Sequence, residues 1–240
     1  MRETPDIETS SDDYASRFAG AAGRYFLDVQ SSTVKRALDG ISKGVAVELG
    51  GGHGQLISLL EEAGYDIVEC GSDASCHDML VERHPDSVMH PVTGDMCKLP
   101  FSDQSADMVI YVRLISHIEN WPELIAESCR VSKQAVIFDY PSLVSANALT
   151  PLIFGLKKGI EKNTRTYISF NKKQLKIELE KHGFVISRHI SQFMLPMFLH
   201  RALKGAKLLQ YVEHFFRLTG LTHLFGSPVI LRADRIVDSK

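Results

Sequence analysis

The sequence lacks the features that would place it in a membrane, in a secretory pathway or in a disulfide-rich class of protein. No uninterrupted apolar run of about 18 residues occurs, so no segment is predicted to span a bilayer. The first 13 residues are polar and acidic and carry no signal-peptide pattern, so we expect a cytoplasmic protein. The four cysteines show neither metal spacing nor a disulfide framework. They are interpreted as small buried side chains: Cys70, Cys76, Cys97 and Cys129.

Two common nucleotide-binding motifs are also missing. A dinucleotide fingerprint reads Gly-x-Gly-x-x-Gly. Counted from Gly50, its last glycine would fall on Gln55, and counted from Gly52 it would fall on Ile57. A phosphate loop would end in Gly-Lys-Ser/Thr, which does not occur here.

What the chain does have is an acidic residue followed by a bare loop between a predicted strand and a predicted helix. Residues 45–55 read VAVELGGGHGQ, with Glu48 at the strand end. Glycines let a ligand lie directly against the backbone, and the helix that follows begins with unpaired N–H groups. The carboxylate favours a cationic ligand or one with several donors over a pyrophosphate. A plain glycine-rich turn is the alternative, and His53 is interpreted as a spacer. The loop glycines are Gly50, Gly51, Gly52 and Gly54.

Strands and helices are predicted to alternate along the chain, and 44% hydrophobic content suffices for one well-packed domain. We therefore expect an α/β fold, a doubly wound, mostly parallel, seven-stranded Rossmann-like sheet with helices on both faces. Residues 1–13 are predicted to be disordered, 14–40 to form a helical flap and 44–140 to form the ligand-binding core. Residues 141–168 and 192–225 are predicted to be insertions that contact a substrate or form a lid.

Two aspartates follow the next predicted strands. Asp73 lies where such folds place a carboxylate that accepts ribose hydroxyl protons, and Asp95 lies beside the same crevice. Together with the glycine loop, these residues resemble the class I S-adenosylmethionine-dependent methyltransferases over about 44–140. The sequences Gly94-Asp95, Leu99-Pro100-Phe101 and Asp107-Met108-Val109 make the chain similar to small-molecule methylases of ubiquinone and menaquinone biosynthesis.

The resemblance implies S-adenosylmethionine as the cofactor and assigns residues to its parts. Glu48 and the glycine loop would line the methionine portion. Asp73 would hold the ribose, and Ala74 would pack beside the adenine. The Asp95 side chain and the backbone N–H of Met96 would bind the adenine edge.

The end of the fourth predicted strand, 111–113, would border the sulfonium. Tyr111 suits this position because aromatic faces attract cations, whereas Arg113 would repel the sulfonium. Arg113 is therefore expected to hold the cofactor carboxylate or an anionic substrate, with a surface position as the alternative. The turn at 131–134 lacks the usual Lys-Pro-Gly-Gly. The strand end also lacks the Asn/Asp-Pro-Pro-aromatic motif of base N-methylases, which argues against that reaction.

Methyl transfer from sulfur depends mostly on alignment, and a base is needed only when the acceptor must lose a proton. His117 is the candidate base, with a packing or capping histidine as the alternative. Tyr14 and Tyr25 would belong to the N-terminal flap, although core packing also accounts for Tyr25. No metal site is predicted.

Charge is divided unevenly along the chain. Residues 1–140 hold 11 Lys/Arg and 23 Asp/Glu, a balance of −12, whereas 141–240 hold 16 and 6, a balance of +10. The basic half predicts an anionic partner, such as a carboxylate or phosphate substrate, an acidic carrier protein or a membrane surface. A solvated basic face is the alternative. The amphipathic, basic segment 193–225 is interpreted as a lid, a helix that covers the core, or a membrane contact.

Three functions stay open from the sequence. The first is O- or C-methylation of a small, anionic or apolar acceptor, which includes lipid-like acids. The second is an RNA or protein methylase that uses the basic half, although nucleic acid is disfavoured. The third is a cofactor-binding module without catalysis.

Overall fold

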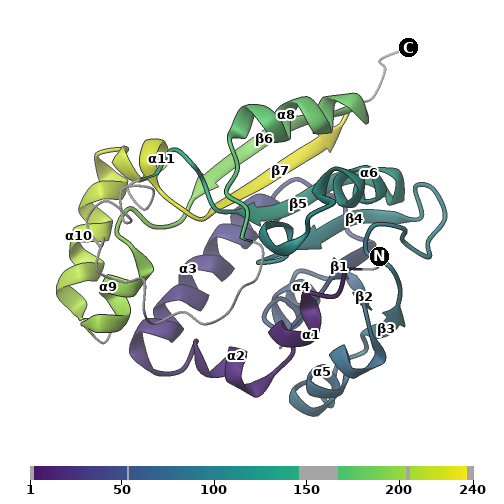
Figure 1. Cartoon of the computed structure of the whole chain (residues 1–240), viewed down its shortest axis with the longest axis horizontal. Coiled ribbons are helices and arrows are strands. Elements are labelled where there is room, and N and C mark those ends of the chain that lie inside the picture. Colours follow the sequence, from purple (N-terminus) through teal and green to yellow (C-terminus); the bar gives the residue numbers. More distant parts are fainter. Residues whose placement is uncertain (1–2, 53, 146–166, 204–205, 237–240) are drawn as a thin grey trace.

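The architecture is a seven-stranded sheet with helices on both faces (Figure 1). The computed structural model describes residues 3–52, 54–145, 167–203 and 206–236. The strand order is β3-β2-β1-β4-β5-β7-β6. The strands are β1 Val45–Leu49, β2 Asp66–Gly71, β3 His90–Thr93, β4 Ala106–Tyr111, β5 Ser132–Tyr140, β6 Phe184–Ser191 and β7 Val229–Arg235.

Among the strands of the described residues, β7 alone runs antiparallel to its neighbours, and it lies between β5 and β6. The strand order reverses beside β1, which pairs in parallel with both β2 and β4. In open parallel sheets, a ligand binds at this switch point, outside the carboxyl ends of the strands. The glycine loop follows β1 at that edge. The predicted fold class is therefore confirmed, and the loop stands where such a fold binds its ligand.

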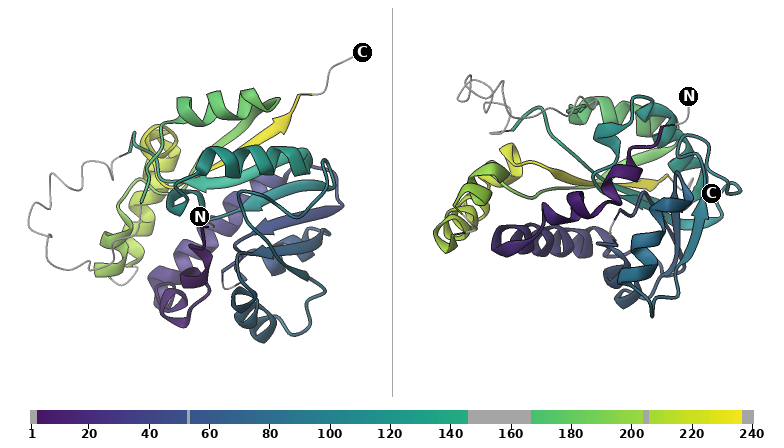
Figure 2. Two further views of the ribbon diagram at one scale, coloured as in Figure 1. Left: turned by 45° about the vertical axis from the view of Figure 1, so that its right-hand side comes forward. Right: turned by 60° about the horizontal axis from the view of Figure 1, so that its bottom comes forward.

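Two helical layers cover the sheet because its strands are apolar on both sides, as buried parallel strands are. One face packs against α3 (Gly20–Leu38), α4 (Ile57–Glu62) and α5 (Asp78–Arg83). The other packs against α6 (Trp121–Val131) and α8 (Lys172–Lys181). Both layers are seen edge-on in Figure 2. Between the two faces, the sheet carries the core of the molecule.

Helices after β6 form a group at one end of the molecule, away from the β3 edge (Figures 1 and 2). They are α9 (Met197–Ala202), α10 (Lys207–Leu218) and α11 (Leu221–Phe225). Whether this group covers a substrate stays a prediction. Across the described ranges, no helix is both long and apolar enough to cross a bilayer.

The N-terminal segment differs from the sequence expectation. Residues 3–13, expected to be disordered, instead include α1 (Asp6–Thr9) and the start of α2 (Asp12–Ser16). The helical flap predicted over 14–40 is divided into α2 and α3, and Gly20, at the start of α3, adopts φ +73°. Polar segments without apolar periodicity give no sequence signal for order, and here order comes from contacts with distant residues.

Candidate functional site

The loop after β1 has a backbone that only glycine adopts readily. Gly50, Gly52 and Gly54 have φ of +61°, +58° and +77°, so the alternate glycines are the left-handed ones. Gly51 lies between them, and a Cβ there would stand 3.1 Å from the Glu69 side chain. The loop therefore presents bare backbone at the carboxyl edge, as the sequence predicts.

Two buried carboxylates lie beneath this loop. Glu48 of β1 and Glu69 of β2 are register partners in the sheet, exposed by 1% and 0%. Glu69 accepts a 2.9 Å hydrogen bond from the Gly51 N–H. It also lies 2.6 Å from Nδ1 of His77, and this contact raises the pKa of His77. Burial, and then the charge of Glu69, raise the pKa of Glu48 well above its usual range. Its Oε2 has no hydrogen-bond partner among the described residues.

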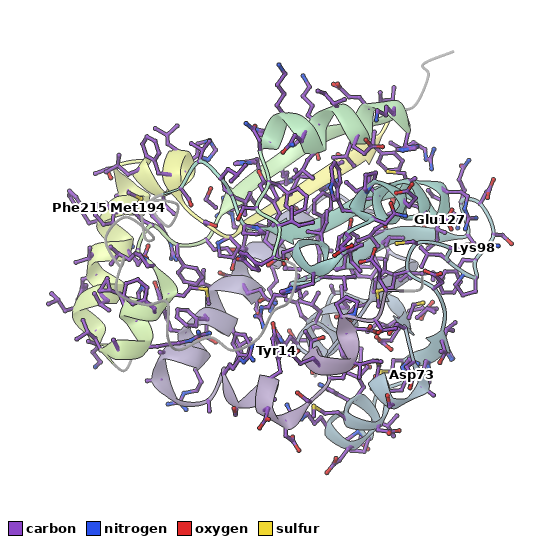
Figure 3. All side chains as sticks on the ribbon, viewed as in Figure 1. Tyr14, Asp73, Lys98, Glu127, Met194 and Phe215 are labelled. Atoms are coloured by element: carbon purple, nitrogen blue, oxygen red, sulfur yellow. The ribbon has the colours of Figure 1, made fainter. Side chains whose placement is uncertain are left out.

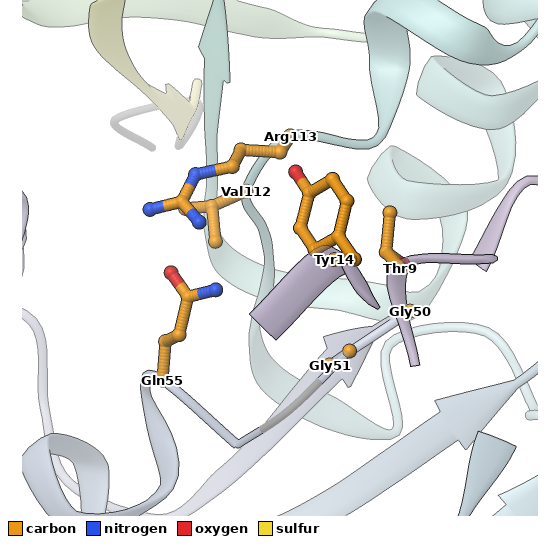
Figure 4. A pocket seen from close by; sticks show the side chains of 8 residues that line it. Thr9, Tyr14, Gly50, Gly51, Gln55, Val112 and Arg113 are labelled. Carbon is orange, nitrogen blue, oxygen red and sulfur yellow. The ribbon is translucent and has the colours of Figure 1, made fainter. Parts of the chain in front are cut away.

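A small hollow of about 10 Å³ opens above the loop (Figure 4). A volume of this size is close to that of a single water, far below the several hundred Å³ of an ordinary ligand pocket. Figure 4 shows the Tyr14 ring between Thr9 and the Arg113 side chain. The lining residues are Thr9, Tyr14, Gly50, Gly51, Gly52, Gln55, Val112 and Arg113.

Helix α1 occupies the space beside the loop. Asp6 is fully buried and accepts hydrogen bonds from the N–H (2.6 Å) and the hydroxyl (2.5 Å) of Ser72, at the end of β2. Its Cβ lies 3.3 Å from the position of a Cβ on Gly50, and the Thr9 carbonyl lies 3.2 Å from that on Gly52. Glu3 accepts hydrogen bonds from the backbone N–H groups of residues 119 and 120. The N-terminal segment thus closes the crevice, and no pattern around Asp6 in the sequence predicts this role for it.

Arg113 points into the hollow from the end of β4, with φ +57°. Its guanidinium donates to the Gln30 side chain and stacks 3.9 Å from the centroid of the Phe18 ring. Its backbone N–H donates to Asp139 (2.5 Å), and burial raises the pKa of that carboxyl to about 6. The Nη1 atom is buried without a hydrogen-bond partner among the described residues. This unpaired donor is suited to an anion.

The residues predicted to bind the adenosine portion lie outside the hollow. Asp73 and Ala74 are exposed, and Asp73 caps the short helix that follows β2 by accepting hydrogen bonds from Ser75. Figure 3 shows Asp73 far from Tyr14. Asp95 is half-buried and accepts a hydrogen bond from the N–H of Cys97. Met96 comes nearer, because its Cε lies 3.3 Å from the position of a Cβ on Gly50.

Other predicted residues point elsewhere. Tyr111 is expected to border the crevice, but its ring is fully buried and stacks on Phe138 with ring centroids 5.2 Å apart. The reason is that side chains alternate along β4, which directs Tyr111 into the core. His117 lies beside Tyr167, with ring centroids 5.7 Å apart, and does not line the hollow. Tyr25 packs against Phe193, as the core alternative held. His53 lies outside the described residues.

Sequence reasoning missed three residues of the site. Gln30 and Gln55 bond to each other at 3.3 Å and connect α3 with the glycine loop, while Glu69 holds that loop from below. Glu69 carried one signal: an acidic residue in the middle of an apolar strand. The glutamines carried none, since polar residues on helices are usually solvated.

A second hollow, of about 140 Å³, lies at the carboxyl ends of β5 and β6. At its wall, the Tyr140 hydroxyl and His189 Nε2 are hydrogen-bonded at 2.9 Å. Burial, together with the charges of Lys172 and His223, lowers the pKa of His189 to about 4, so its imidazole is neutral near pH 7. The remaining lining residues are Ser142, Val144, Asn171, Lys172, Ser191, Leu224 and Gly226.

This shift predicts acid sensitivity. Below about pH 6.5, the unfolded chain binds a proton that the native His189 does not bind, so stability falls as pH drops from about 6.5 to about 4. In His189→Gln, which can keep a hydrogen bond to Tyr140, urea unfolding should show a smaller loss of stability between about pH 7 and about pH 5. The control is His90→Gln at an exposed site. An unchanged pH dependence in His189→Gln would contradict the assignment.

Comparison with known proteins agrees with this geometry. Residues 47–138 match the family model of a methyltransferase domain, which spans the strands and loops around the crevice. No curated protein matches the sequence significantly.

Several solved structures share the fold. One is magnesium protoporphyrin IX methyltransferase from Synechocystis PCC 6803 with bound SAH, with a TM-score of 0.66, 14% identity and coverage of 93% of this chain and 94% of that chain. Another, from Thermotoga maritima, is described as a SAM-dependent methyltransferase and possible histamine N-methyltransferase, with a TM-score of 0.67, 16% identity and coverage of 96% and 99%.

A third is geranyl diphosphate C-methyltransferase from Streptomyces coelicolor A3(2), with a TM-score of 0.58, 15% identity and coverage of 87% of this chain and 76% of that chain. At these identities the likeness shows the fold. The chain therefore carries a methyltransferase domain over residues 47–138 and has the fold of the class I S-adenosylmethionine-dependent methyltransferases, as its resemblance predicts.

Proposed function

We propose that this protein transfers a methyl group from S-adenosylmethionine to a small, anionic or apolar acceptor, on oxygen or carbon. The observation that carries the proposal is the bare glycine loop facing the unpaired Nη1 of Arg113 across one hollow. A bare backbone and a fixed cation at the carboxyl end of β1 suit a ligand that carries an amino-acid group. The methyltransferase domain and the fold support the choice of cofactor.

The residues present fit this cofactor once α1 moves away. Cβ atoms at Gly50 and Gly52 would stand 3.2–3.3 Å from the atoms now beside them. The loop therefore admits a ligand only because these two residues have no Cβ. Arg113 would bind the methionine carboxylate, and Gln55 would contact the same end. The place that Asp6 now holds, against Ser72, lies toward the adenosine portion. The Glu69 carboxylate would make this edge favourable for a ligand with positive charge.

When bound, the cofactor supplies a methyl group already activated on a sulfonium. The protein then has to exclude water and align the acceptor with the carbon–sulfur bond, which is the largest part of the task. Gln30 and the Phe18 ring hold the Arg113 guanidinium in place, where its charge would bind an anion. His117 stays a candidate base that would have to turn from Tyr167 toward the crevice.

The proposal of a small-molecule acceptor is supported by the names of similar structures and not by contacts within this chain. Two of the similar structures are named for methylating magnesium protoporphyrin IX and geranyl diphosphate, which are both small molecules. The basic half of the chain leaves an RNA or protein acceptor as the alternative.

The acceptor class is tested with S-adenosylmethionine labelled in its methyl group. Pure protein and a cell extract divided by ultrafiltration should give label in the small-molecule fraction and none in RNA or protein. Gly52→Val, whose side chain would meet Thr9 or the ligand, is the inactive control. Label in the macromolecular fraction alone would favour the alternative, and no label in either fraction would favour a non-catalytic module.

Arg113 is predicted to bind the cofactor carboxylate. In calorimetry, Arg113→Gln should weaken S-adenosylhomocysteine binding by about 10- to 100-fold, the value of a charge-assisted hydrogen bond. The same variant should bind 5′-methylthioadenosine, which has no carboxylate, as the wild type does. Arg17→Gln, at an exposed site nearby, is the matched control. Equal weakening for both ligands would show that Arg113 supports the fold of the site.

Asp6 is predicted to compete with the cofactor. Because α1 must leave before a ligand enters, the apparent affinity is reduced by the fraction of closed molecules. Asp6→Ala removes both hydrogen bonds to Ser72 and should tighten S-adenosylhomocysteine binding about tenfold, mainly through faster association. Asp13→Ala, exposed on α2, should change nothing. Weaker binding in Asp6→Ala would instead make Asp6 a contact of the bound cofactor.

A further inference from the structure

Helix α10 turns a row of large apolar side chains toward solvent. Their spacing of three, four and three residues places them on one side of the helix. Such a contiguous row is unusual on a soluble surface and indicates a contact with an apolar partner. The exposed fractions are 72% for Leu208, 70% for Tyr211, 58% for Phe215 and 75% for Leu218.

The opposite side of α10 is fixed by a buried acid. Among the twelve residues of this helix, only Glu213 is buried. It accepts hydrogen bonds of 2.9 Å from the backbone N–H groups of Met194 and Leu195 and lies 3.3 Å from Nε2 of the buried His200. Arg217 adds a 3.0 Å bond to the Gln192 carbonyl. These contacts hold the helix with its apolar row outward, and Figure 3 shows Phe215 at the outer edge of the molecule.

The charges around the row have one sign. Over the described part of residues 197–225, Lys207 is exposed at the edge of the row, whereas the single acid, Glu213, is buried. The guanidinium groups of Arg201 and Arg217 turn the other way, toward the Phe26 ring and the Gln192 carbonyl. Leu224 and Phe225 of α11, exposed by 62% and 41%, add to the apolar surface at the same end of the molecule. The α10 surface is thus apolar and aromatic, with the positive charge of Lys207 at its edge and no exposed acid among those residues.

We propose that the α10 surface, formed by Leu208, Tyr211, Phe215 and Leu218 with Lys207 at its edge, binds an anionic lipid membrane from one side. An amphipathic helix with leucine and aromatic residues on one face and lysine or arginine beside it lies in the headgroup region. Each basic residue near an anionic bilayer adds about fivefold to the binding. A second copy of this surface would bring like charges together, which disfavours a symmetric dimer. The proposal does not depend on the methyl-transfer activity.

The test is co-sedimentation of the full chain with vesicles of phosphatidylcholine alone or mixed with phosphatidylglycerol. The wild type should bind the anionic vesicles, with lower affinity at high salt. Leu208→Ser/Phe215→Ser should weaken binding at least tenfold. The matched control is Val81→Ser/Val88→Ser, two exposed apolar residues elsewhere. Lys207→Gln should weaken binding about fivefold, and Lys173→Gln on α8 should not.

Depth of contact provides a second measurement. Phe215→Trp should be quenched by bilayers with brominated acyl chains, whereas Val88→Trp should not, above the signal of the single native tryptophan, Trp121. Circular dichroism of each variant shows whether it is folded.

Three results would overturn the proposal. One is that the wild type and Leu208→Ser/Phe215→Ser do not differ: both bind anionic vesicles with equal affinity, or neither binds them. Another is equal binding to neutral and anionic vesicles. The third is a concentration-dependent dimer that Leu208→Ser/Phe215→Ser abolishes, which would assign the surface to a second copy. None of these readouts requires the cofactor, so failure here leaves the proposed function untouched.

Discussion

The packing of the glycine loop onto two buried carboxylates determines the rest of the site. Glu48 and Glu69 stand side by side in neighbouring strands, where burial of charge is costly unless hydrogen bonds offset it. Glu69 accepts such a bond from the Gly51 N–H and forms an ion pair with His77, so the backbone of the loop is itself a partner of the core. Any Cβ at Gly51 would press on these groups, which is why this position of the loop is a glycine. One arrangement therefore gives the crevice its shape and places the buried Glu69 carboxylate beneath it.

The position of α1 follows from the same charge arrangement. Asp6 adds a third buried carboxylate near Glu69, and its charge contributes to the raised pKa of His77. Hydrogen bonds from Ser72 make this position possible, but the region gains negative charge with no added cation. A ligand that displaces Asp6 would remove this third carboxylate from the region. In the proposed mechanism, the repulsion between Asp6 and Glu69 therefore favours the exchange of α1 for the cofactor.

Local pattern was sufficient for the fold and for the loop, since strand alternation and glycine spacing act between near neighbours. The bare loop between β1 and α4 is an example, because its glycines directly follow the strand that ends at Leu49. The pattern failed where the partner is distant: Asp6 bonds to a residue 66 positions away, and nothing near it in the sequence marks it as buried. The expectation for Tyr111 differs from the structure for another reason: an offset of one residue along a strand reverses the direction of a side chain.

The apolar arc of α10 explains why its orientation could not be predicted from periodicity. Apolar residues cover about half of the helix circumference. The periodicity therefore does not decide which side of this apolar arc packs against the protein and which side faces solvent. In the structure, Leu209 and Phe216 are half-buried beside Glu213, while Phe215 is turned outward. The acid decides between the two orientations, because its hydrogen bonds to Met194 and Leu195 exist only when that side faces inward. A single buried carboxylate thereby leaves a large apolar area in solvent, which is a cost that a partner surface would remove.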